Sequence, residues 1–289
     1  MQKIAFATYD GFPGLTDDDR LAADALAQRG IAVEAVLWTD PSVGWSDYLA
    51  VVLRSCWDYH LKPDEFRAWL DKLENEKTAL WNPYQVLRWN MDKNYLRDLQ
   101  GQGVPVLDSV WLSRGTSTNL SDLMRQQGWQ QAVVKPMISA AANGTEVFSF
   151  EQAREGQRGF EELLNTGGVI VQDFAEEIQT SGEWSLVFFN KKYSHAVIKR
   201  PQIGDFRVQR DFGGTAQAIE APKQLVGQAH QVIDRIDNDL LYARVDGIER
   251  KRQLFLMELE LIEPYLFFEL DSWAAGRFAD ALVEKTSGA

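Results

Sequence analysis

The sequence predicts an α/β domain at the N-terminus, followed by an α+β region. In the first 100 residues, short apolar runs alternate with helical patterns, which is the order of a parallel sheet with right-handed crossovers. After about residue 180 the apolar runs are longer, as in antiparallel strands. The chain has 289 residues, of which 45% are hydrophobic, and this length suggests about two domains with a sizeable core.

In the N-terminal region, short apolar runs predict strands at residues 4–8, 31–37 and 48–53. Helical patterns predict helices at residues 17–30, 63–73 and 90–100. Gly30 ends the first of these helices, because glycine readily adopts the left-handed conformation that follows many helices. Pro63 suits the start of the second helix, where no amide hydrogen is needed.

Beyond a boundary near residue 100, the order of elements changes. Apolar runs predict strands that begin at residues 104–106 and continue at 132–135, 146–150, 169–174, 183–189, 194–199, 242–245 and 254–261. Residues 225–240 are predicted to form an amphipathic helix, and the tail at residues 286–289 is expected to be loose.

Composition narrows the function classes. The net charge of −12 argues against a nucleic-acid or anionic-membrane partner, because both favour clustered Lys and Arg, although a local basic pocket remains compatible with it. Cys56 is the one cysteine, so no intrachain disulfide is expected, and a reducing compartment is the simplest interpretation. The N-terminus has no leader pattern and no apolar stretch is long enough to span a membrane, so a cytoplasmic location is expected.

Several enzyme and metal classes are disfavoured by the motifs that are missing. Three histidines and one cysteine do not suit a structural zinc site. The sequence has no G-x-S-x-G elbow and no G-x-x-x-x-G-K-[ST] loop, which disfavours a serine hydrolase and a P-loop kinase.

A pair of strands near the C-terminus carries three carboxylates. Because side chains alternate along a strand, Glu258 and Glu260 are expected on one face and Met257 on the other, while Arg244 and Asp246 share a face of the preceding strand. A turn at residues 247–253 would make the two strands a hairpin and gather the carboxylates, which suits Mg²⁺. An exposed acidic hairpin is the alternative interpretation of the same pattern.

Lysines and polar residues follow several other strands. Lys135 ends an apolar strand and can reach a cleft, and the small residues at 139–145 can bring backbone N–H groups close to phosphates. The strand ending at Gln172, Asp173 and Phe174 can offer hydrogen bonds to a base. Lys199, Arg200 and Arg207 form a cationic group that suits phosphate. Alone, each pattern also fits a strand end or hairpin tip that faces solvent.

The order of these segments resembles that of the ATP-grasp superfamily, in its glutathione synthetase-like branch, and especially a subgroup that includes the D-cycloserine ligase. The resemblance covers nearly the whole chain. The segments that carry it are 134–136, 172–174, 182–183, 199–200, 204–207, 213–214, 242–246 and 257–260, together with 53–59 and 89–93.

The resemblance implies a fold and a cofactor. It implies a Rossmann-like N-terminal domain at residues 1–100, a small ATP-grasp subdomain at 101–178, and a C-terminal subdomain at 179–289, with ATP enclosed between the two subdomains. ATP would act with one or two magnesium ions, and manganese is an alternative ion.

It also implies roles for particular residues. Lys93 and Lys135 would contact the ATP phosphates or the adenine edge. Gln172, Asp173 and Phe174 would form the adenine hinge, with Glu183 nearby and Glu177 or Glu176 on the ribose. Magnesium would be held by three carboxylates: Asp246, Glu258 and Glu260.

The remaining implied roles concern the reaction itself. Arg207 and Lys199 would neutralise the transferred phosphoryl group, and Arg244 would hold the acyl phosphate or a substrate carboxylate. Two departures from the family pattern stand out: Glu260 replaces the usual Asn, and the loop at 139–145 has one glycine.

The expected reaction is ATP-dependent ligation of a small-molecule carboxylate, from an amino acid or modified amino acid, to an amine through an acyl phosphate. Residues at the C-terminal end of the strand at 48–53 form a candidate substrate segment: Arg54, Ser55, Trp57, Asp58 and Tyr59. The same segment also fits an aromatic interdomain contact.

Three alternative functions remain at this point. They are addition of amino acids to a peptide or protein, ring closure of one substrate, and a non-catalytic ATP-binding module. The oligomeric state is not readable from the sequence, and a homodimer is the commonest assembly.

Overall fold

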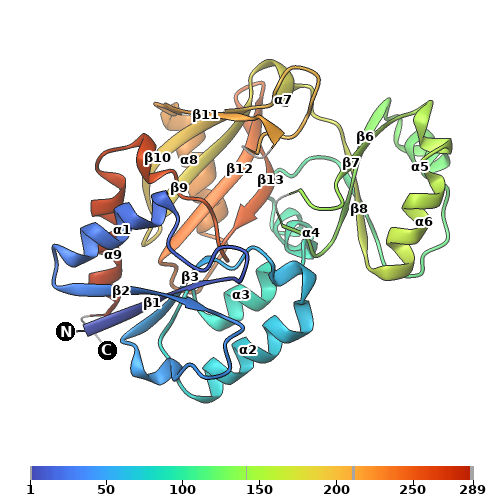
Figure 1. Cartoon of the computed structure of the whole chain (residues 1–289). Coiled ribbons are helices and arrows are strands. Elements are labelled where there is room, and N and C mark those ends of the chain that lie inside the picture. Colours follow the sequence, from blue (N-terminus) through green and yellow to red (C-terminus); the bar gives the residue numbers. More distant parts are fainter. Residues whose placement is uncertain (1, 141, 210–211, 287–289) are drawn as a thin grey trace.

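The strands of the protein form three separate sheets (Figure 1). The computed structural model describes residues 2–140, 142–209 and 212–286. In this part of the chain, no helix is long and apolar enough to cross a membrane.

The first sheet is parallel and has the strand order β2-β1-β3-β4. Its strands are β1 (Gln2–Thr8), β2 (Ile31–Leu37), β3 (Ala50–Ser55) and β4 (Leu80–Trp81). The helical segments of this region are α1 (Asp17–Ala27), η1 (Trp45–Asp47), η2 (Tyr59–Leu61), α2 (Pro63–Asn75), α3 (Tyr84–Asn90) and α4 (Asn94–Gly101). The parallel pairing predicted from the βαβ pattern is confirmed.

The second sheet is antiparallel and has the order β5-β8-β6-β7. Its strands are β5 (Ser109–Leu112), β6 (Gln131–Pro136), β7 (Glu146–Ser149) and β8 (Val169–Asp173). Its helical segments are α5 (Leu120–Gln127), η3 (Gln152–Arg154) and α6 (Gln157–Thr166). Figure 1 shows this unit, in green, standing to one side of the other two sheets.

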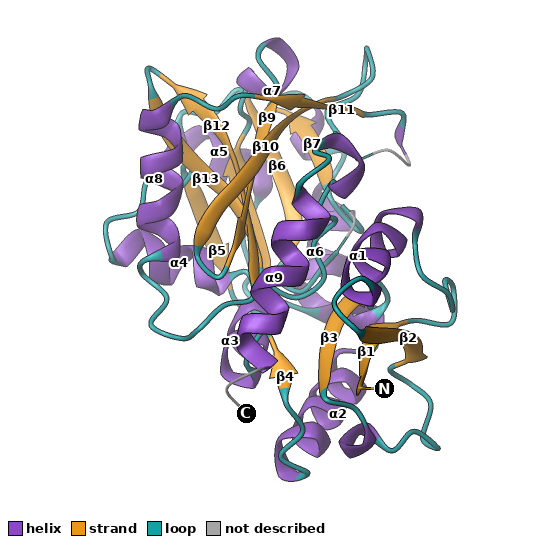
Figure 2. Ribbon diagram, turned by 90° about the vertical axis from the view of Figure 1, so that its left-hand side faces the viewer, coloured by secondary structure: helices purple, strands orange, loops and turns teal. Residues whose placement is uncertain are grey.

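The third sheet is antiparallel with the order β11-β10-β9-β12-β13. Its strands are β9 (Glu183–Phe189), β10 (Lys192–Arg200), β11 (Thr215–Ile219), β12 (Tyr242–Arg250) and β13 (Gln253–Glu260). The helical segments around it are α7 (Glu177–Thr180), α8 (Lys223–Ile233), η5 (Phe268–Leu270) and α9 (Ala274–Thr286). Figure 2 shows α8 along one side of this sheet.

The first and third sheets share a hydrophobic core. Phe6 of β1, Phe189 of β9 and Phe278 of α9 belong to one buried cluster, and the Phe6 and Phe278 ring centroids lie 6.3 Å apart. The C-terminal helix therefore packs against the N-terminal sheet. The three sheets fall within the three predicted segments, although the domain boundaries at 100 and 178 remain a prediction.

Several predicted boundaries are wrong. Residues 104–106 form no strand but one isolated bridge from Val106 to Leu256, because this segment lies against the outer edge of β13. The helix predicted at 90–100 is two helices, α3 and α4, and α8 ends at Ile233 rather than at residue 240. Of the predicted loose tail, residues 287–289 lie outside the described part, and Thr286 is helical.

Candidate active site

Strands β12 and β13 bring the three predicted carboxylates together. The two strands form the predicted hairpin, in which Asp246 lies opposite Glu258 and Arg244 opposite Glu260. The turn is shorter than the predicted 247–253, because the strands pair as far as Arg250 and Gln253. Lys251 and Arg252 form the turn, with φ values of 53° and 64°.

A β-bulge corrects the predicted orientation of Met257. The register shifts between Asp246 and Gly247, which lie opposite Glu258 and Leu256, so Met257 has no partner of its own. Leu256 and Leu259 belong to the large core, whereas Met257 packs with the cluster around Ile248 and Ala175. The bulge therefore turns Met257 away from the face predicted for it.

Asp246 is the centre of a buried charge network. Its carboxylate is 1% exposed and accepts hydrogen bonds from Ser185 Oγ at 2.6 Å, Lys199 Nζ at 3.1 Å and Arg244 Nη2 at 2.7 Å. Lys199 also pairs with Glu183 at 2.6 Å. Burial alone would raise the pKa of Asp246, but Arg244 and Lys199 outweigh burial and hold it well below its usual range.

Glu258 and Glu260 flank this network, and their pKa values shift in opposite directions. Lys93 Nζ lies 3.0 Å from Glu258, and Arg244 Nη2 donates to Glu260. Burial opposes ionisation of Glu258, but Lys93 and Lys135 lower its pKa. Burial raises the pKa of Glu260 to about 8, with Asp246 and Glu258 adding to the effect against Arg244.

The segment that precedes α4 holds the edge strand β13 in place. Asn90 Nδ2 donates to the Leu259 carbonyl at 2.8 Å, and Leu261 N donates to Asn90 Oδ1 at 2.9 Å. The Asn90 amide thus satisfies backbone groups that an edge strand would leave unpaired. Lys93, three residues on, reaches both Glu258 and the Ser139 carbonyl, the latter at 2.8 Å.

Lys135 and Gln172 meet on neighbouring strands of the second sheet. Lys135 Nζ donates to Gln172 Oε1 at 3.2 Å, and Gln172 Nε2 donates to Ser109 Oγ at 2.9 Å. Burial lowers the pKa of Lys135 to about 8. No ion pair joins Lys135 to any carboxylate among the described residues, although Glu258 is near enough to act on its pKa. Asp173 and Phe174 follow at the end of β8.

Two predicted residues lie in ion pairs of their own. Glu177 makes two hydrogen bonds to Arg250, at 2.6 and 3.0 Å. Arg207 pairs with Asp205 at 2.8 Å, and its guanidinium lies 3.7 Å from the Phe212 ring centroid. The structure thus gathers Lys93, Lys135, Lys199 and Arg244 around the carboxylates, whereas Arg207 pairs with Asp205 outside this group.

The predicted substrate segment is mostly buried. Arg54 Nε donates to Asp19 Oδ1 at 2.8 Å, and Ser55 Oγ donates to Asp19 Oδ2 at 3.2 Å. Asp58 accepts from Trp38 Nε1 at 2.8 Å, so its carboxylate is already used within the N-terminal domain.

The two aromatic residues of the segment differ in their exposure and in their neighbours. Tyr59 is 5% exposed and packs in the core with Phe66, at a ring-centroid distance of 5.1 Å. Trp57 instead lies near the half-exposed rings of Tyr9 and Phe12, at 6.2 and 6.4 Å. Of the five residues in the segment, Trp57 is therefore the one that is not buried.

The sequence patterns missed several residues of the site. Ser185 and Asn90 act through hydrogen bonds to distant strands, and no local pattern marks them. Glu263 is 9% exposed, and burial raises its pKa to about 7. Its position three residues after Glu260 was the one available signal.

The donor set fits a hard cation in its chemistry. Asp246, Glu258 and Glu260 offer oxygen atoms alone, which Mg²⁺ prefers. The side chains of Glu258 and Glu260 remain 35% and 25% exposed, so both can reach a ligand. In residues 2–140, 142–209 and 212–286, however, no three His, Cys, Asp or Glu side chains converge closely enough to hold a metal ion. The internal partners of Asp246 account for this.

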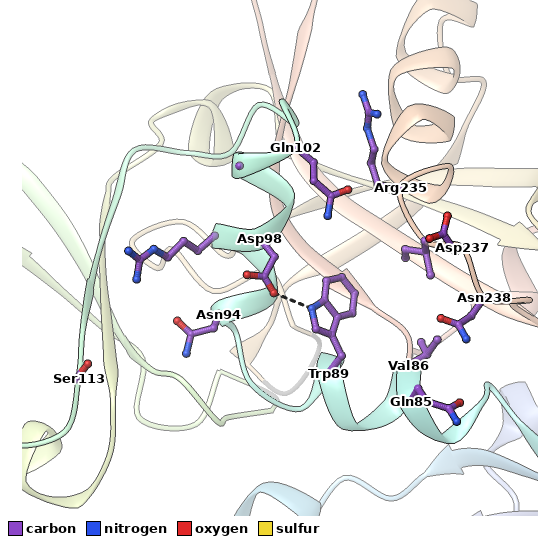
Figure 3. A pocket seen from close by; sticks show the side chains of 13 residues that line it. Gln85, Val86, Trp89, Asn94, Asp98, Gln102, Ser113, Arg235, Asp237 and Asn238 are labelled. Atoms are coloured by element: carbon purple, nitrogen blue, oxygen red, sulfur yellow. Dashed lines mark hydrogen bonds between the residues drawn. The ribbon is translucent and has the colours of Figure 1, made fainter.

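A large cavity lies elsewhere. It has a volume of about 970 Å³ and runs between α3, α4 and the turn after α8 (Figure 3). Trp89 donates to Asp98 at 2.9 Å on its wall, and Arg235 and Asn238 face it from the other side. None of the predicted site residues lines this open, polar groove.

Comparison with solved structures defines the class of protein. The fold matches the crystal structure of the D-cycloserine synthetase DcsG with a TM-score of 0.87 and 29% identity, over 98% of this chain and 99% of that one. It also matches the D-alanine–D-alanine ligase from Bacillus anthracis (TM-score 0.73, 14% identity, 100% and 98% covered). A RimK domain ATP-grasp protein from Sphaerobacter thermophilus DSM 20745 matches with a TM-score of 0.71 and 17% identity, over 97% and 99% of the chains. This is the ATP-grasp fold, as predicted.

Sequence comparison identifies the branch of the ATP-grasp ligases to which the chain belongs. Residues 4–82 match the model of the N-terminal domain of D-cycloserine synthetase DcsG. The cycloserine biosynthesis protein DcsG of Streptomyces lavendulae is 31% identical over 277 residues, which are 91% of either chain. The chain belongs to the family of DcsG, within the ATP-grasp ligases, and is an ATP-dependent carboxylate–amine ligase.

Proposed function

We propose that the protein transfers the γ-phosphoryl group of ATP to the carboxylate of an amino acid or modified amino acid, and that an amine then captures the acyl phosphate. The products are ADP, phosphate and an amide. The observation that carries this proposal is the buried cluster of Lys93, Lys135, Lys199 and Arg244 beside three carboxylates, since phosphoryl transfer depends on positioning and charge stabilisation.

The nucleotide site follows from the position of the second sheet. Lys135 and Lys93 contact the phosphates or the adenine edge, and the hinge of Gln172, Asp173 and Phe174 receives the base. Lys135 supports this assignment, because it is a buried cation that no carboxylate pairs with in the described chain. Glu183 stays with Lys199, and Glu177 or Glu176 takes the ribose.

Magnesium is assigned to Glu258 and Glu260, with Asp246 as the third carboxylate. One or two ions are proposed, and manganese is the alternative. A bound divalent ion would neutralise charge on the ATP phosphates. Related solved structures hold ATP in a D-alanine–D-alanine ligase, and magnesium with ADP in the ligase PsnB.

The cationic side chains orient the reactants. Lys199 and Arg207 offset charge on the transferred phosphoryl group, and Arg244 holds the activated carboxylate. For Arg207, this role requires release of its pair with Asp205. Trp57 and the neighbouring segment, Arg54, Ser55, Asp58 and Tyr59, contact or shape the substrate site.

Ring closure of a single substrate is the second candidate. It is favoured by the 31% identity to a cycloserine biosynthesis protein, whose product name denotes a cyclic molecule. In that case the carboxylate and the amine belong to one compound.

Phosphate release from ATP and magnesium tests the proposal. The carboxylates would be pools of L- and D-amino acids, with hydroxylamine as a general amine trap. Hydroxamate formed from one pool would support the ligase and identify the carboxylate. Phosphate release from a single amino acid without any added amine, and with no dipeptide among the products, would favour ring closure. No hydroxamate from any pool would contradict the proposed substrate class.

A further inference from the structure

Glu263, three residues after Glu260, has no cationic partner in the described part of the chain. Glu258 pairs with Lys93, Glu260 with Arg244, and Asp246 and Glu183 with Lys199. Glu263 is 9% exposed, and no ion pair joins it to any of the described cations. This distinguishes Glu263 from the other carboxylates that surround the proposed acyl phosphate.

Glu263 lies between the reacting groups and the N-terminal sheet. It follows β13 in a segment that touches both sides: the Pro264 carbonyl accepts from Arg54 Nη2 at 3.1 Å, and the Tyr265 carbonyl accepts from Arg244 Nη1 at 2.9 Å. The charge of Glu263 also acts on Glu258, Lys93 and Arg244. On the other side, after burial, Glu263 is the strongest charge that raises the pKa of the Tyr59 hydroxyl. Tyr59 follows the C-terminal end of β3, which is the edge of a parallel sheet where ligands bind.

An unpaired buried carboxylate lowers the stability of the folded chain. Such a cost is typical of positions where a ligand supplies the missing charge. ATP and the phosphorylated carboxyl group are negative and do not suit Glu263. The α-ammonium group of an amino-acid donor would suit its charge, but losing that contact would slow capture of every amine equally. An amine substrate suits it, because at neutral pH it arrives as a positive ammonium ion and must lose a proton before it can attack.

We propose that Glu263 binds the ammonium group of the amine substrate and accepts its proton. This inference rests on the proposed ligase function. The N–H bond breaks, and the proton passes to the Glu263 carboxylate, which leaves a neutral amine. The nitrogen lone pair forms the C–N bond to the acyl carbon, the C–O bond to phosphate breaks, and the second nitrogen proton leaves with phosphate.

The matched test compares two amines in wild type and Glu263→Gln. Methylamine is protonated at neutral pH, whereas hydroxylamine is largely neutral and needs no proton acceptor. With the carboxylate pool that the wild type uses, we expect Glu263→Gln to lower methylamine capture by about 100-fold and to leave hydroxamate formation within about threefold. Glu162→Gln, an exposed residue that pairs with Arg158, is the control for loss of one carboxylate.

Two further readouts separate the proposed role from a structural one or a metal-binding one. Glu263→Gln should raise the thermal midpoint, because it removes an unpaired buried charge. It should also leave the magnesium concentration for half-maximal rate unchanged. An equal loss with both amines, a lowered midpoint, or a shifted magnesium requirement would each overturn the proposal. A wild type that forms no hydroxamate from any pool would instead overturn the proposed function, and this inference with it.

Discussion

Lys135 and Glu263 are two buried charges that differ from their neighbours in the same way. Lys135 belongs to the second sheet and has no carboxylate partner, while Glu263 follows β13 and has no cationic partner, among the described residues. Both act electrostatically on the Lys93–Glu258 pair that lies near them. Charges that the fold leaves unmatched indicate the charge of the ligand: a phosphate beside Lys135 and an ammonium beside Glu263.

The largest effect is expected at the Lys93–Glu258 pair, which lies near both of these charges. Glu258→Gln removes the carboxylate that pairs with Lys93 and that we assign to magnesium. We expect turnover to fall by about 10³-fold or more, with a thermal midpoint close to that of the wild type. Phosphate release and circular dichroism melting would measure this. Turnover like that of the wild type, in a folded variant, would remove Glu258 from the metal site.

A structural pair in the N-terminal domain provides the contrast. Arg54 and Asp19 are each 2% exposed, and their ion pair is 2.8 Å long. Asp19→Ala leaves the Arg54 charge buried without this partner, so we expect the free energy of unfolding to fall by about 3 kcal/mol. Urea denaturation would measure it. A loss below about 1 kcal/mol would show that the pair is not structural, and that Arg54 is better placed in a ligand site.

How far the sequence predicts these features depends on burial. β2 and β9 were predicted to the residue, because their apolar patterns are bounded by clear turns. β11 was missed since most of its side chains are exposed, which leaves an edge strand without an apolar pattern. No element was predicted for α9, although its apolar face completes the core of the first sheet.

The carboxylate cluster was predictable, but its partners were not. Strand alternation and the hairpin predicted that Asp246 and Glu258 gather, and the register confirms that they lie opposite each other. The bulge at Met257 and the Lys93–Glu258 pair depend on segments far apart in the chain, so no local pattern contains them. The roles assigned to these residues stay predictions until variants are measured.

A smaller effect is expected at Lys135, the buried cation without a carboxylate partner among the described residues. Lys135→Gln removes a charge that we assign to ATP, and we expect the KM for ATP to rise by about 10- to 100-fold. Because burial lowers the pKa of Lys135 to about 8, the charged form that binds phosphate is lost as pH rises. ATP affinity of the wild type should therefore fall above about pH 8.

Lys135→Arg is the control for this prediction, because it keeps a charge at every accessible pH. Its ATP affinity should change less with pH than that of the wild type. Equal pH dependence in the two proteins, measured by calorimetry, would show that another group causes the change and that Lys135 is not the phosphate contact.

Asp18 extends the comparison to another buried carboxylate, which belongs to α1 and lies away from the reacting groups. It is 2% exposed, and burial raises its pKa to about 8, with the nearby Glu269 carboxyl adding to the effect. The folded chain thus keeps Asp18 protonated where the unfolded chain, with an ordinary pKa of 3.8, has it ionised. Unfolding then releases a proton, so the free energy of unfolding should fall as pH rises from about 4 to 8 and level off above that.

Asp18→Asn should abolish this part of the pH dependence, which we expect to amount to about 3–4 kcal/mol between about pH 5 and 8. Urea denaturation of both proteins across this range would measure the difference. Asp18 and Glu263 would then differ in their ligand: a proton alone neutralises Asp18, whereas Glu263, whose pKa burial raises to about 7, also takes the ammonium group of the amine. If Asp18→Asn instead abolished amine capture and left the pH dependence of unfolding unchanged, an unmatched carboxylate near α1 would be the better candidate for the amine site.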